Sequence, residues 1–290
     1  MWLWRDKLLE FLREDVGFAD LTTELVIPEG TVARCRIIAK QDGVVSGVEE
    51  AAELFRMAGV GVVEALESGS KVKKGDAVLE VEGDARAVFA CERVALNILM
   101  RMSGIATATA EMVRRAREVN PNVVVAGTRK TTPGLRWMEK KAITHGGGDP
   151  HRYRLDDCIL IKRPHVVVAG GVGEAVRRVR EALSFTKKVE VEVSTPEEAV
   201  EAAKAGADIV MLDNMSPDGV KRTLELLEKE GLRRRVLVEA SGGITPENVA
   251  EYAATGVDIV SSGYLTHSAR ALDMGLKVVW FRKPPRPHRP

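Results

Sequence analysis

The second half of the chain alternates short apolar runs with amphipathic segments, and this alternation limits the possible folds more than any other feature. Six runs have the length and residue types of strands. They are 123–127 (VVVAG), 158–162 (CILIK), 189–193 (VEVEV), 209–214 (IVMLDN), 236–243 (VLVEASGG) and 259–263 (IVSSG). Helical patterns lie between them, and repeated strand–helix units of this kind build a parallel sheet.

Three of the intervening segments carry clear helix boundaries. They read TPEEAVEAAKAG, SPDGVKRTLELLEKEG and TPENVAEYAATG. Each begins with a Ser/Thr-Pro pair, which supplies a capping hydroxyl and then a proline suited to the first helical turn. Each ends on glycine, the residue preferred where a helix stops. We therefore expect a helix over each segment.

Charged and polar residues gather where the predicted strands end. They are Lys130, Lys162, Glu192, Asp213 and Ser241. In a β/α barrel the carboxyl ends of the strands converge on one mouth, where catalytic groups are placed, whereas an open sheet spreads them along an edge. With six strands rather than eight, we predict an incomplete parallel β/α barrel over residues 106–267.

The first part of the chain predicts a smaller domain of a different kind. Residues 3–13 have helical spacing, and residues 15–28 are rich in loop-forming types. Short β-branched runs between residues 31 and 81 predict an open-sheet α/β domain, and residues 89–119 predict a long helix that Gly104 bends or interrupts. We assign residues 1–105, with 268–290, to this domain. The Pro-rich end from Val278 predicts a solvated tail.

Residues 128–163 hold nine Lys/Arg residues against four acids, although the whole chain has a net charge of only +1. Arginine forks suit carboxylates and phosphates, and the glycines at 146–148 allow a close approach of the backbone to a ligand. The segment predicts a pocket for a small molecule with several negative charges. The turn Ser241-Gly242-Gly243, between a strand and a predicted helix, is a second candidate anion site.

Glu192 and Asp213 are carboxylates at successive strand ends, and a buried acid without a partner is costly. Two interpretations remain open. They bind ribose hydroxyls and Mg²⁺, which prefers carboxylates together with substrate phosphates. Alternatively, they form structural ion pairs with Lys162 and Lys130.

Several short motifs occur together in a fixed order: TRKTTPGLR, GGGxxHR, LIK, VEVEV, LDN, SGG and GxLTHS. In this order they resemble the quinolinate phosphoribosyltransferase family over nearly the whole chain. The resemblance implies an incomplete barrel that transfers the phosphoribosyl group of phosphoribosyl pyrophosphate to quinolinate. Decarboxylation then gives nicotinate mononucleotide, CO₂ and pyrophosphate, with Mg²⁺ as cofactor.

The resemblance also implies residue roles. The catalytic residues are Lys130, Lys162, Glu192 and Asp213. Quinolinate is bound by Arg93, Arg129, His151, Arg152 and Lys162. The phosphoribosyl donor is bound by Thr128, Lys130, Glu192, Asp213, Ser241, Gly242, Gly243, Gly263 and His267, and Mg²⁺ is held by Glu192 and Asp213. Arg93 reaches the site from a partner subunit in the family, so we expect a homodimer or a dimer-based hexamer.

Two positions depart from the family pattern. Gly127 stands where an aspartate usually precedes TRKT, and Arg163-Pro164 follow LIK in place of an acid and asparagine.

Three other functions stay open: a molybdenum-associated, anion-binding relative of the family, a Schiff-base aldolase using a strand-end lysine, and a carrier protein suggested by the lipoyl-like segment 69–84.

Composition narrows the partners. Aromatic residues make up 4% of the chain, which argues against stacking on nucleic-acid bases. The near-zero net charge argues against a nucleic-acid or anionic-membrane surface. The three cysteines, at 35, 91 and 158, match no zinc spacing and fit a reducing compartment. No apolar run is long enough to span a membrane, and we expect a cytoplasmic protein.

Overall fold

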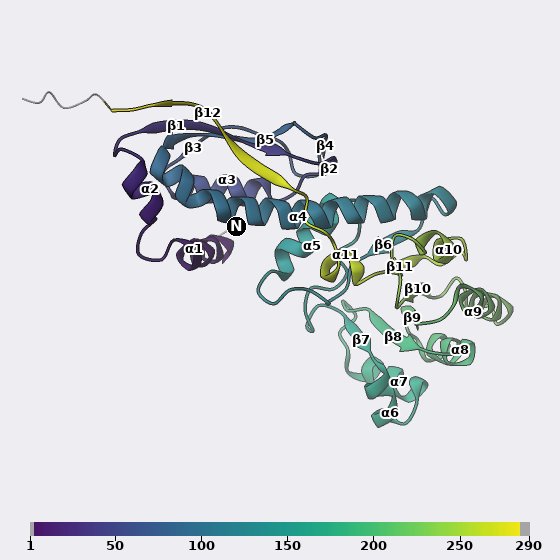
Figure 1. Ribbon diagram of the computed structural model, residues 1–290. Helices are drawn as coiled ribbons and strands as arrows, with labels where there is room; N and C mark the ends of the chain where they lie inside the picture. The colour runs from purple at the N-terminus through teal and green to yellow at the C-terminus, as the bar shows by residue number, and fades with distance from the viewer. Residues whose placement is uncertain (1–2, 285–290) are drawn as a thin grey trace, which may run out of the picture. The chain divides into compact units, whose positions relative to one another are not determined.

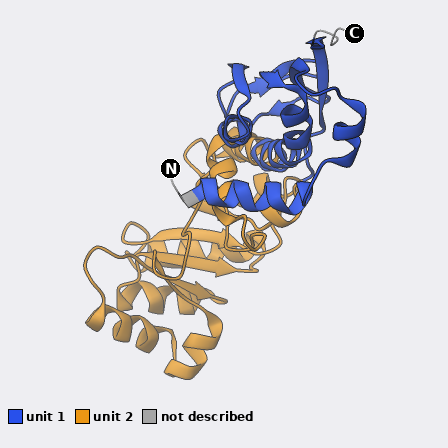
Figure 2. Ribbon diagram, turned by 90° about the vertical axis from the view of Figure 1, so that its left-hand side faces the viewer, with its two compact units in different colours: residues 1–107, 270–290 blue, residues 108–269 orange. Residues whose placement is uncertain are grey.

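The computed structural model describes residues 3–284. The chain divides into two compact units, coloured separately in Figure 2. Unit 1 comprises residues 1–107 and 270–290, and unit 2 comprises residues 108–269. None of the helices within residues 3–284 is long and apolar enough to cross a membrane.

Unit 1 is built on an antiparallel sheet with strand order β12-β1-β5-β3, accompanied by a two-stranded β2-β4 sheet (Figure 1). Its strands are β1 (Val32–Ala39), β2 (Gly43–Val44), β3 (Gly61–Ala65), β4 (Lys71–Val72), β5 (Ala77–Asp84) and β12 (Met274–Arg282). Its helices are α1 (Leu3–Val16), α2 (Leu21–Val26), α3 (Val48–Met57) and the first part of α4 (Ala85–Val119). The predicted small open-sheet domain is confirmed, and its antiparallel sheet makes it an α+β fold.

Two local expectations in unit 1 were wrong. Residues 21–26 form helix α2 inside the stretch expected to be loop, because the Asp20 carboxylate accepts a hydrogen bond from the Thr23 amide at 3.0 Å and caps the helix. Val278–Arg282 belong to strand β12, which pairs with β1, rather than to a solvated tail. The prolines that suggested a tail all come after the strand, at positions 284, 285, 287 and 290. Residues 285–290 of the expected tail lie outside the described part.

Helix α4 runs through Gly104 without a break, contrary to the expectation that this glycine bends or interrupts it. The glycine instead permits a close approach. A Cβ atom at this position would overlap the carbonyl oxygen of Arg270 and lie 2.9 Å from the Cα atom of Ala271. Gly104 therefore marks where the returning C-terminal segment packs against the helix.

Unit 2 is a six-stranded parallel sheet with the order β6-β11-β10-β9-β8-β7. Its strands are β6 (Val124–Ala126), β7 (Ile159–Ile161), β8 (Val189–Val193), β9 (Ile209–Asp213), β10 (Leu237–Ser241) and β11 (Ile259–Ser261). Its helices are the end of α4, α5 (Arg136–His145), α6 (Arg163–Ala169), α7 (Val172–Ala182), α8 (Pro196–Ala205), α9 (Pro217–Lys229), α10 (Val249–Ala253) and α11 (Tyr264–His267). Among the described residues, β6 and β7 do not pair with each other, so the predicted incomplete barrel is confirmed.

Two of the three predicted helix starts occur as expected. The hydroxyls of Thr195 and Ser216 cap α8 and α9 and accept hydrogen bonds from amides three residues later. The third is wrong: residues 246–248 form a turn, and α10 begins only at Val249. This matters for the site, because the Ser241-Gly242-Gly243 turn does not open directly into a helix.

Strands β8, β9 and β10 carry their polar residues on one face and have only apolar residues on the other. Val191, Val210 and Val238 are fully buried, and helices such as α7 and α8 pack against these strands (Figure 1). Because side chains alternate along a strand, the intervening residues point into the barrel. The register aligns the strand ends, with Asp213 opposite Ser241.

We predict that Gly104→Ala destabilises the protein, although a glycine-to-alanine change inside a helix is normally favourable. The added methyl group must displace the backbone at Arg270, and overpacking of this kind costs on the order of 1–3 kcal/mol. Chemical denaturation measures the loss. As a control, Ala110→Gly on the same helix should cost only about 1 kcal/mol, the propensity difference. Equal or higher stability of Gly104→Ala would contradict the close approach.

Candidate functional site

A cavity of about 410 Å³ opens at the carboxyl ends of the barrel strands, within unit 2. Its wall is made by Gly127, Thr128, Arg129, Lys130, His151, Arg152, Leu160, Lys162, Glu192, Met211, Asp213, Glu239, Ser241, Gly242 and Ser261. Most of the residues predicted from strand ends and from the basic segment therefore meet in one pocket.

Arg129 and Arg152 are the cations that most constrain this pocket. Arg152 is buried, and its Nη1 donates to the carbonyl of Cys158 at 3.0 Å. Burial first, and the neighbouring Arg129 second, lower the pKa of Arg152. The Nε atom of Arg129 is buried and has no hydrogen-bond partner within the described residues. Two guanidinium groups placed this closely favour an anionic ligand that contacts both.

The two strand-end lysines have different surroundings. Lys162 Nζ donates to Glu192 Oε1 at 2.6 Å, so one of the two structural ion pairs considered for Glu192 and Asp213 is present. The other, between Asp213 and Lys130, is not found among the described residues. Lys130 is exposed, and its aliphatic stem lies against Gly263.

The turn at residues 241–243 has a backbone that only glycine adopts easily. Gly242 and Gly243 have φ values of +100° and +63°. A side chain on Gly242 would meet the backbone nitrogen of Asn214 at 2.9 Å as well as its side-chain amide. The backbone N–H of Asn214 donates a hydrogen bond to the Ser241 carbonyl at 2.8 Å. The Ser261 hydroxyl donates a hydrogen bond to the Ser241 hydroxyl. The turn is thus fixed from two neighbouring strand ends.

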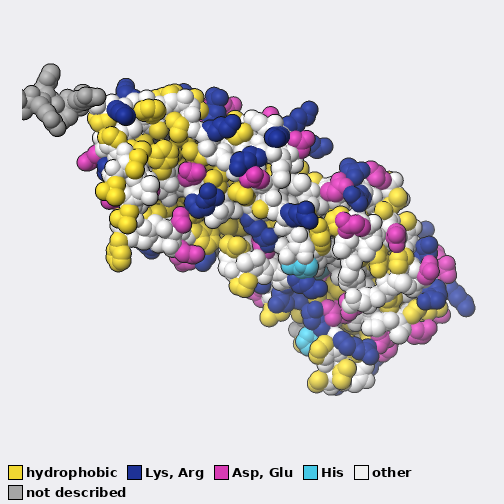
Figure 3. Space-filling model, in the orientation of Figure 1, with side chains coloured by type: hydrophobic (Ala, Val, Ile, Leu, Met, Phe, Trp, Pro, Cys, Tyr) yellow, Lys and Arg dark blue, Asp and Glu magenta, His cyan; other side chains and the backbone are white. Residues whose placement is uncertain are grey.

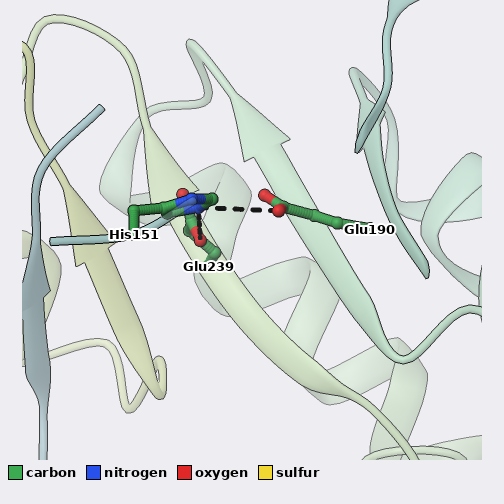
Figure 4. A group of neighbouring side chains, drawn as sticks. All are labelled: His151, Glu190 and Glu239. Carbon is green, nitrogen blue, oxygen red and sulfur yellow. Dashed lines mark ion pairs between the residues drawn. The ribbon is translucent and has the colours of Figure 1, made fainter. Parts of the chain in front are cut away.

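In the wall of the pocket, His151 faces two carboxylates, as Figure 4 shows. Its Nε2 atom lies 3.5 Å from Glu190 Oε2 and 3.4 Å from Glu239 Oε2. Glu190 and Glu239 come from β8 and β10 and are completely buried. None of their four carboxylate oxygens has a hydrogen-bond partner among the described residues.

These three side chains are close enough to hold a metal ion, but the state of His151 opposes it. Nδ1 accepts a hydrogen bond from the Arg152 amide at 2.8 Å, so in the neutral ring the proton is on Nε2. Burial lowers the pKa of His151, but the two carboxylates outweigh it and raise the pKa to about 10. A doubly protonated ring would lose the Nδ1 acceptor, but its Nε2 would also carry a proton. In either state Nε2 faces the carboxylates as a donor, and we interpret the group as an ion-pair cluster.

A larger cavity, of about 1020 Å³, lies at the opposite end of the barrel. It is lined by residues that begin strands, among them Val124, Ile209, Leu237 and Ile259. It shares His151, Arg152 and Glu239 with the smaller pocket. Lys130 and Lys162 line only the smaller pocket, which is therefore the better candidate for a site that binds a polyanion.

Four predicted site residues do not line the pocket. Gly243, Gly263 and His267 lie beside it: a Cβ atom on Gly263 would touch both Lys130 and His267. Arg93 lies on α4 in unit 1.

Glu190 and Glu239 were missed by the sequence analysis. Each precedes a recognised residue, Glu192 or Ser241, by two positions. The period of two in a strand therefore could have placed both inside the barrel.

The two departures from the family pattern have local explanations. A Cβ atom at position 127 would lie 2.5 Å from Ile143 Cδ1, so a residue larger than glycine requires the Ile143 side chain to shift. Pro164 lies in the first turn of α6, where proline is favourable, and Arg163 pairs with Glu198 at 2.6 Å. His165 Nδ1 accepts a hydrogen bond from the backbone N–H of Lys162 at 2.9 Å, and this contact fixes the strand end that carries Lys162.

Lysines, arginines and acids are interspersed over the face drawn in Figure 3, as the near-zero net charge suggests. The fold and the pocket together define a barrel protein whose mouth is built for a small polyanionic ligand.

Comparison with known proteins gives the family. Residues 105–277 match the C-terminal domain of quinolinate phosphoribosyl transferase, and residues 20–103 match its N-terminal domain. A probable nicotinate-nucleotide pyrophosphorylase (carboxylating) from Methanothermobacter thermautotrophicus is 51% identical over 94% of this chain and 98% of its own. The human nicotinate-nucleotide pyrophosphorylase (carboxylating) is 43% identical over 92% and 89%. The crystal structure of NadC from Streptococcus pyogenes superposes with a TM-score of 0.90 at 37% identity, covering 98% of both chains. The chain belongs to the quinolinate phosphoribosyl transferase family.

We predict that His151→Ala lowers the free energy of unfolding by about 3–5 kcal/mol, because it leaves two buried carboxylates without their partner. Adding Glu190→Gln and Glu239→Gln to this variant should restore part of the loss, since the stranded charges are then removed. Denaturant titration measures both. The exposed His267→Ala serves as control and should change stability by less than about 0.5 kcal/mol. A triple variant less stable than His151→Ala would disprove the ion-pair interpretation.

Proposed function

We propose that this chain is a nicotinate-nucleotide pyrophosphorylase (carboxylating): it transfers the phosphoribosyl group of phosphoribosyl pyrophosphate to quinolinate, with decarboxylation, in NAD biosynthesis. The observation that carries the proposal is the pair Arg129 and Arg152, held side by side in a pocket with strand-end lysines. Quinolinate carries two adjacent carboxylates, and two fixed guanidinium groups match that charge.

In this proposal Arg129 and Arg152 bind the quinolinate carboxylates, with Lys162 and His151 beside them. The buried, unpartnered Nε of Arg129 supports this role. The Lys162 ammonium already pairs with Glu192, so it contributes a cation whose position is fixed.

The phosphoribosyl donor occupies the rest of the mouth. Its 5-phosphate binds the backbone N–H groups of Ser241-Gly242-Gly243, with Gly263 and His267 alongside. The two glycines support this assignment, because the lack of a side chain at Gly242 leaves the backbone N–H groups of the turn accessible to an oxyanion. Thr128 and Lys130 bind the pyrophosphate side, and Glu192 and Asp213 accept hydrogen bonds from the ribose hydroxyls.

Mg²⁺ fits this arrangement. Asp213 lines the pocket with no ion-pair partner among the described residues, and Glu192 has one oxygen engaged by Lys162. Mg²⁺ favours one or two carboxylates completed by substrate phosphates, and bound there it would neutralise charge on the departing pyrophosphate.

The reaction then needs positioning and charge stabilisation more than covalent help. The pyridine nitrogen forms the bond to C1 of the ribose while the bond from C1 to pyrophosphate breaks. The resulting cationic ring accepts the electron pair released when the 2-carboxylate leaves as CO₂. A proton then replaces it at ring carbon 2. Lys130 and Lys162 stabilise the charges that develop and are the candidate proton donors.

A Schiff-base aldolase is less compatible with the pocket. Imine formation requires a neutral amine, whereas Lys162 lies in an ion pair with Glu192. Treatment with a carbonyl compound and borohydride would trap such an intermediate, and we expect no covalent adduct.

The direct test is to mix the protein with quinolinate, phosphoribosyl pyrophosphate and Mg²⁺. We predict stoichiometric nicotinate mononucleotide and CO₂, and a loss of at least about tenfold in kcat for Lys162→Ala, or ~1.4 kcal/mol of transition-state stabilisation. The exposed Lys204→Met variant, on α8, is the control. Failure of the wild-type protein to form product would overturn the proposed function and favour a relative that only binds anions.

We propose further that the active unit is at least a dimer in which Arg93 completes the quinolinate site of a partner. Arg93→Ala and Lys162→Ala subunits should each be inactive alone. Because a mixed dimer contains one intact site, co-assembly should regain about a quarter to a half of wild-type activity. Activity assays after demonstrated subunit exchange measure this. Absence of recovery would exclude a shared site.

A further inference from the structure

Helix α5 carries three charged side chains on the face toward the two loops that bear Arg129 and Arg152. Arg136, Glu139 and Lys140 are spaced i, i+3 and i+4, which places them on one side of a helix. Glu139 and Lys140 are almost completely buried, at 1% and 0% exposure. Burying charges this deeply is unfavourable unless each is satisfied, so their contacts indicate what they are for.

Glu139 holds the loop that carries Arg129 and Lys130. Its two carboxylate oxygens accept hydrogen bonds from the Thr132 amide at 3.0 Å and the Thr132 hydroxyl at 2.8 Å. Arg136 adds a hydrogen bond from Nε to the Thr131 hydroxyl at 3.0 Å. The Thr131 amide in turn donates to the Arg129 carbonyl. The position of Arg129 is thus tied to α5 through two consecutive threonines.

Lys140 holds the loop that carries His151 and Arg152. Its Nζ donates to the carbonyl of Pro150 and lies 3.4 Å from that of His151. His151 has a φ of +55°, a left-handed conformation that is costly for a residue with a side chain. Arg136 also donates to the Tyr153 carbonyl at 3.2 Å. The same helix face therefore fixes both arginine-bearing loops.

The charge on Lys140 has a clear energetic cost. Burial first, and the neighbouring Arg136 second, lower the pKa of Lys140 to about 8. A methionine of similar length would fill the same space without desolvating a charge. An ammonium group at this position is therefore explained if its hydrogen bonds to the loop carbonyls are needed to hold the loop that carries His151 and Arg152.

We propose that Glu139 and Lys140 are positioning residues that set the distance between Arg129 and Arg152, and so select a ligand with two adjacent carboxylates. The pocket distinguishes such a dicarboxylate from a monocarboxylate because the loops that carry both arginines are held in place before the ligand arrives. This inference rests on the proposed function, since quinolinate is the dicarboxylate concerned.

The test compares Lys140→Met, which removes the ammonium group, with Lys140→Arg, which keeps a buried donor. Glu139→Gln probes the other loop, and Lys204→Met is the matched control because Lys204 lies on α8 in an exposed pair with Glu230. Two ligands are titrated by calorimetry: benzene-1,2-dicarboxylate, which has the adjacent carboxylates but no reacting nitrogen, and benzoate, which has one. Thermal unfolding of each variant shows that it is folded at the temperature used.

We expect Lys140→Met to bind the dicarboxylate about tenfold more weakly or worse, the equivalent of ~1.4 kcal/mol, with benzoate changed less than about twofold. KM for quinolinate should rise while KM for phosphoribosyl pyrophosphate stays within about twofold, a split that general destabilisation does not produce. Lys140→Arg should restore part of the dicarboxylate affinity, and Glu139→Gln should weaken it.

Two results would overturn the inference: unchanged dicarboxylate affinity in Lys140→Met, or equal losses for quinolinate and the phosphoribosyl donor. If Lys140→Met is unfolded at the assay temperature, Glu139→Gln decides by the same criteria. The binding measurements do not require turnover. A wild-type protein that prefers the dicarboxylate but forms no product would therefore refute the proposed function and leave this inference standing.

Discussion

The pocket depends on the two neighbouring guanidinium groups of Arg129 and Arg152, for which no direct ion pair is found among the described residues. Arg152 is buried and is destabilised by its own desolvation and by Arg129 beside it. Like charges in a poorly hydrated site repel strongly, so the surrounding structure must supply the free energy that keeps them adjacent. Glu190 and Glu192 lower that cost by acting favourably on the charge of Arg152, and the hydrogen bonds from α5 hold the loops in place. A dianionic ligand relieves the remaining repulsion, which makes the empty pocket ready for it.

The parallel sheet makes this arrangement possible because it separates packing from chemistry along each strand. In β8, Val189, Val191 and Val193 are buried on one face, while Glu190 and Glu192 alternate with them on the other. The apolar face provides hydrophobic stabilisation against the helices, so the inner face is free to carry charge. Glu190 is buried deep in the barrel, and Glu192, two residues further, reaches the mouth.

The sequence predicted the features that depend on local patterns. Strand–helix alternation gave the barrel, and residues at strand ends gave Lys162, Glu192, Asp213 and Ser241, all of which line the pocket. The sequence-based predictions were wrong where contacts between distant parts of the chain determine the local structure. Residues 278–282 form a strand because β1, far earlier in the chain, offers an edge for pairing, and Gly104 is required by a segment 166 residues later in the numbering, at Arg270. The proposed roles of Glu139 and Lys140 could not be predicted either, because two opposite charges on an amphipathic helix normally indicate a solvent-exposed face.

Fixing the cations also explains how a pocket this rich in positive charge can remain selective. Flexible lysines would attract any polyanion, including the phosphates of the donor, with little discrimination. A guanidinium held by its backbone and its neighbours instead demands a partner of matching geometry, because a poorly matched ligand leaves buried donors unsatisfied. The pocket divides these tasks. Lys130 is exposed and adaptable beside Gly263, whereas Arg129 and Arg152 lie on loops that are hydrogen-bonded to α5. In this proposal, selectivity for the acceptor originates in a helix, α5, that contributes no side chain to the pocket wall.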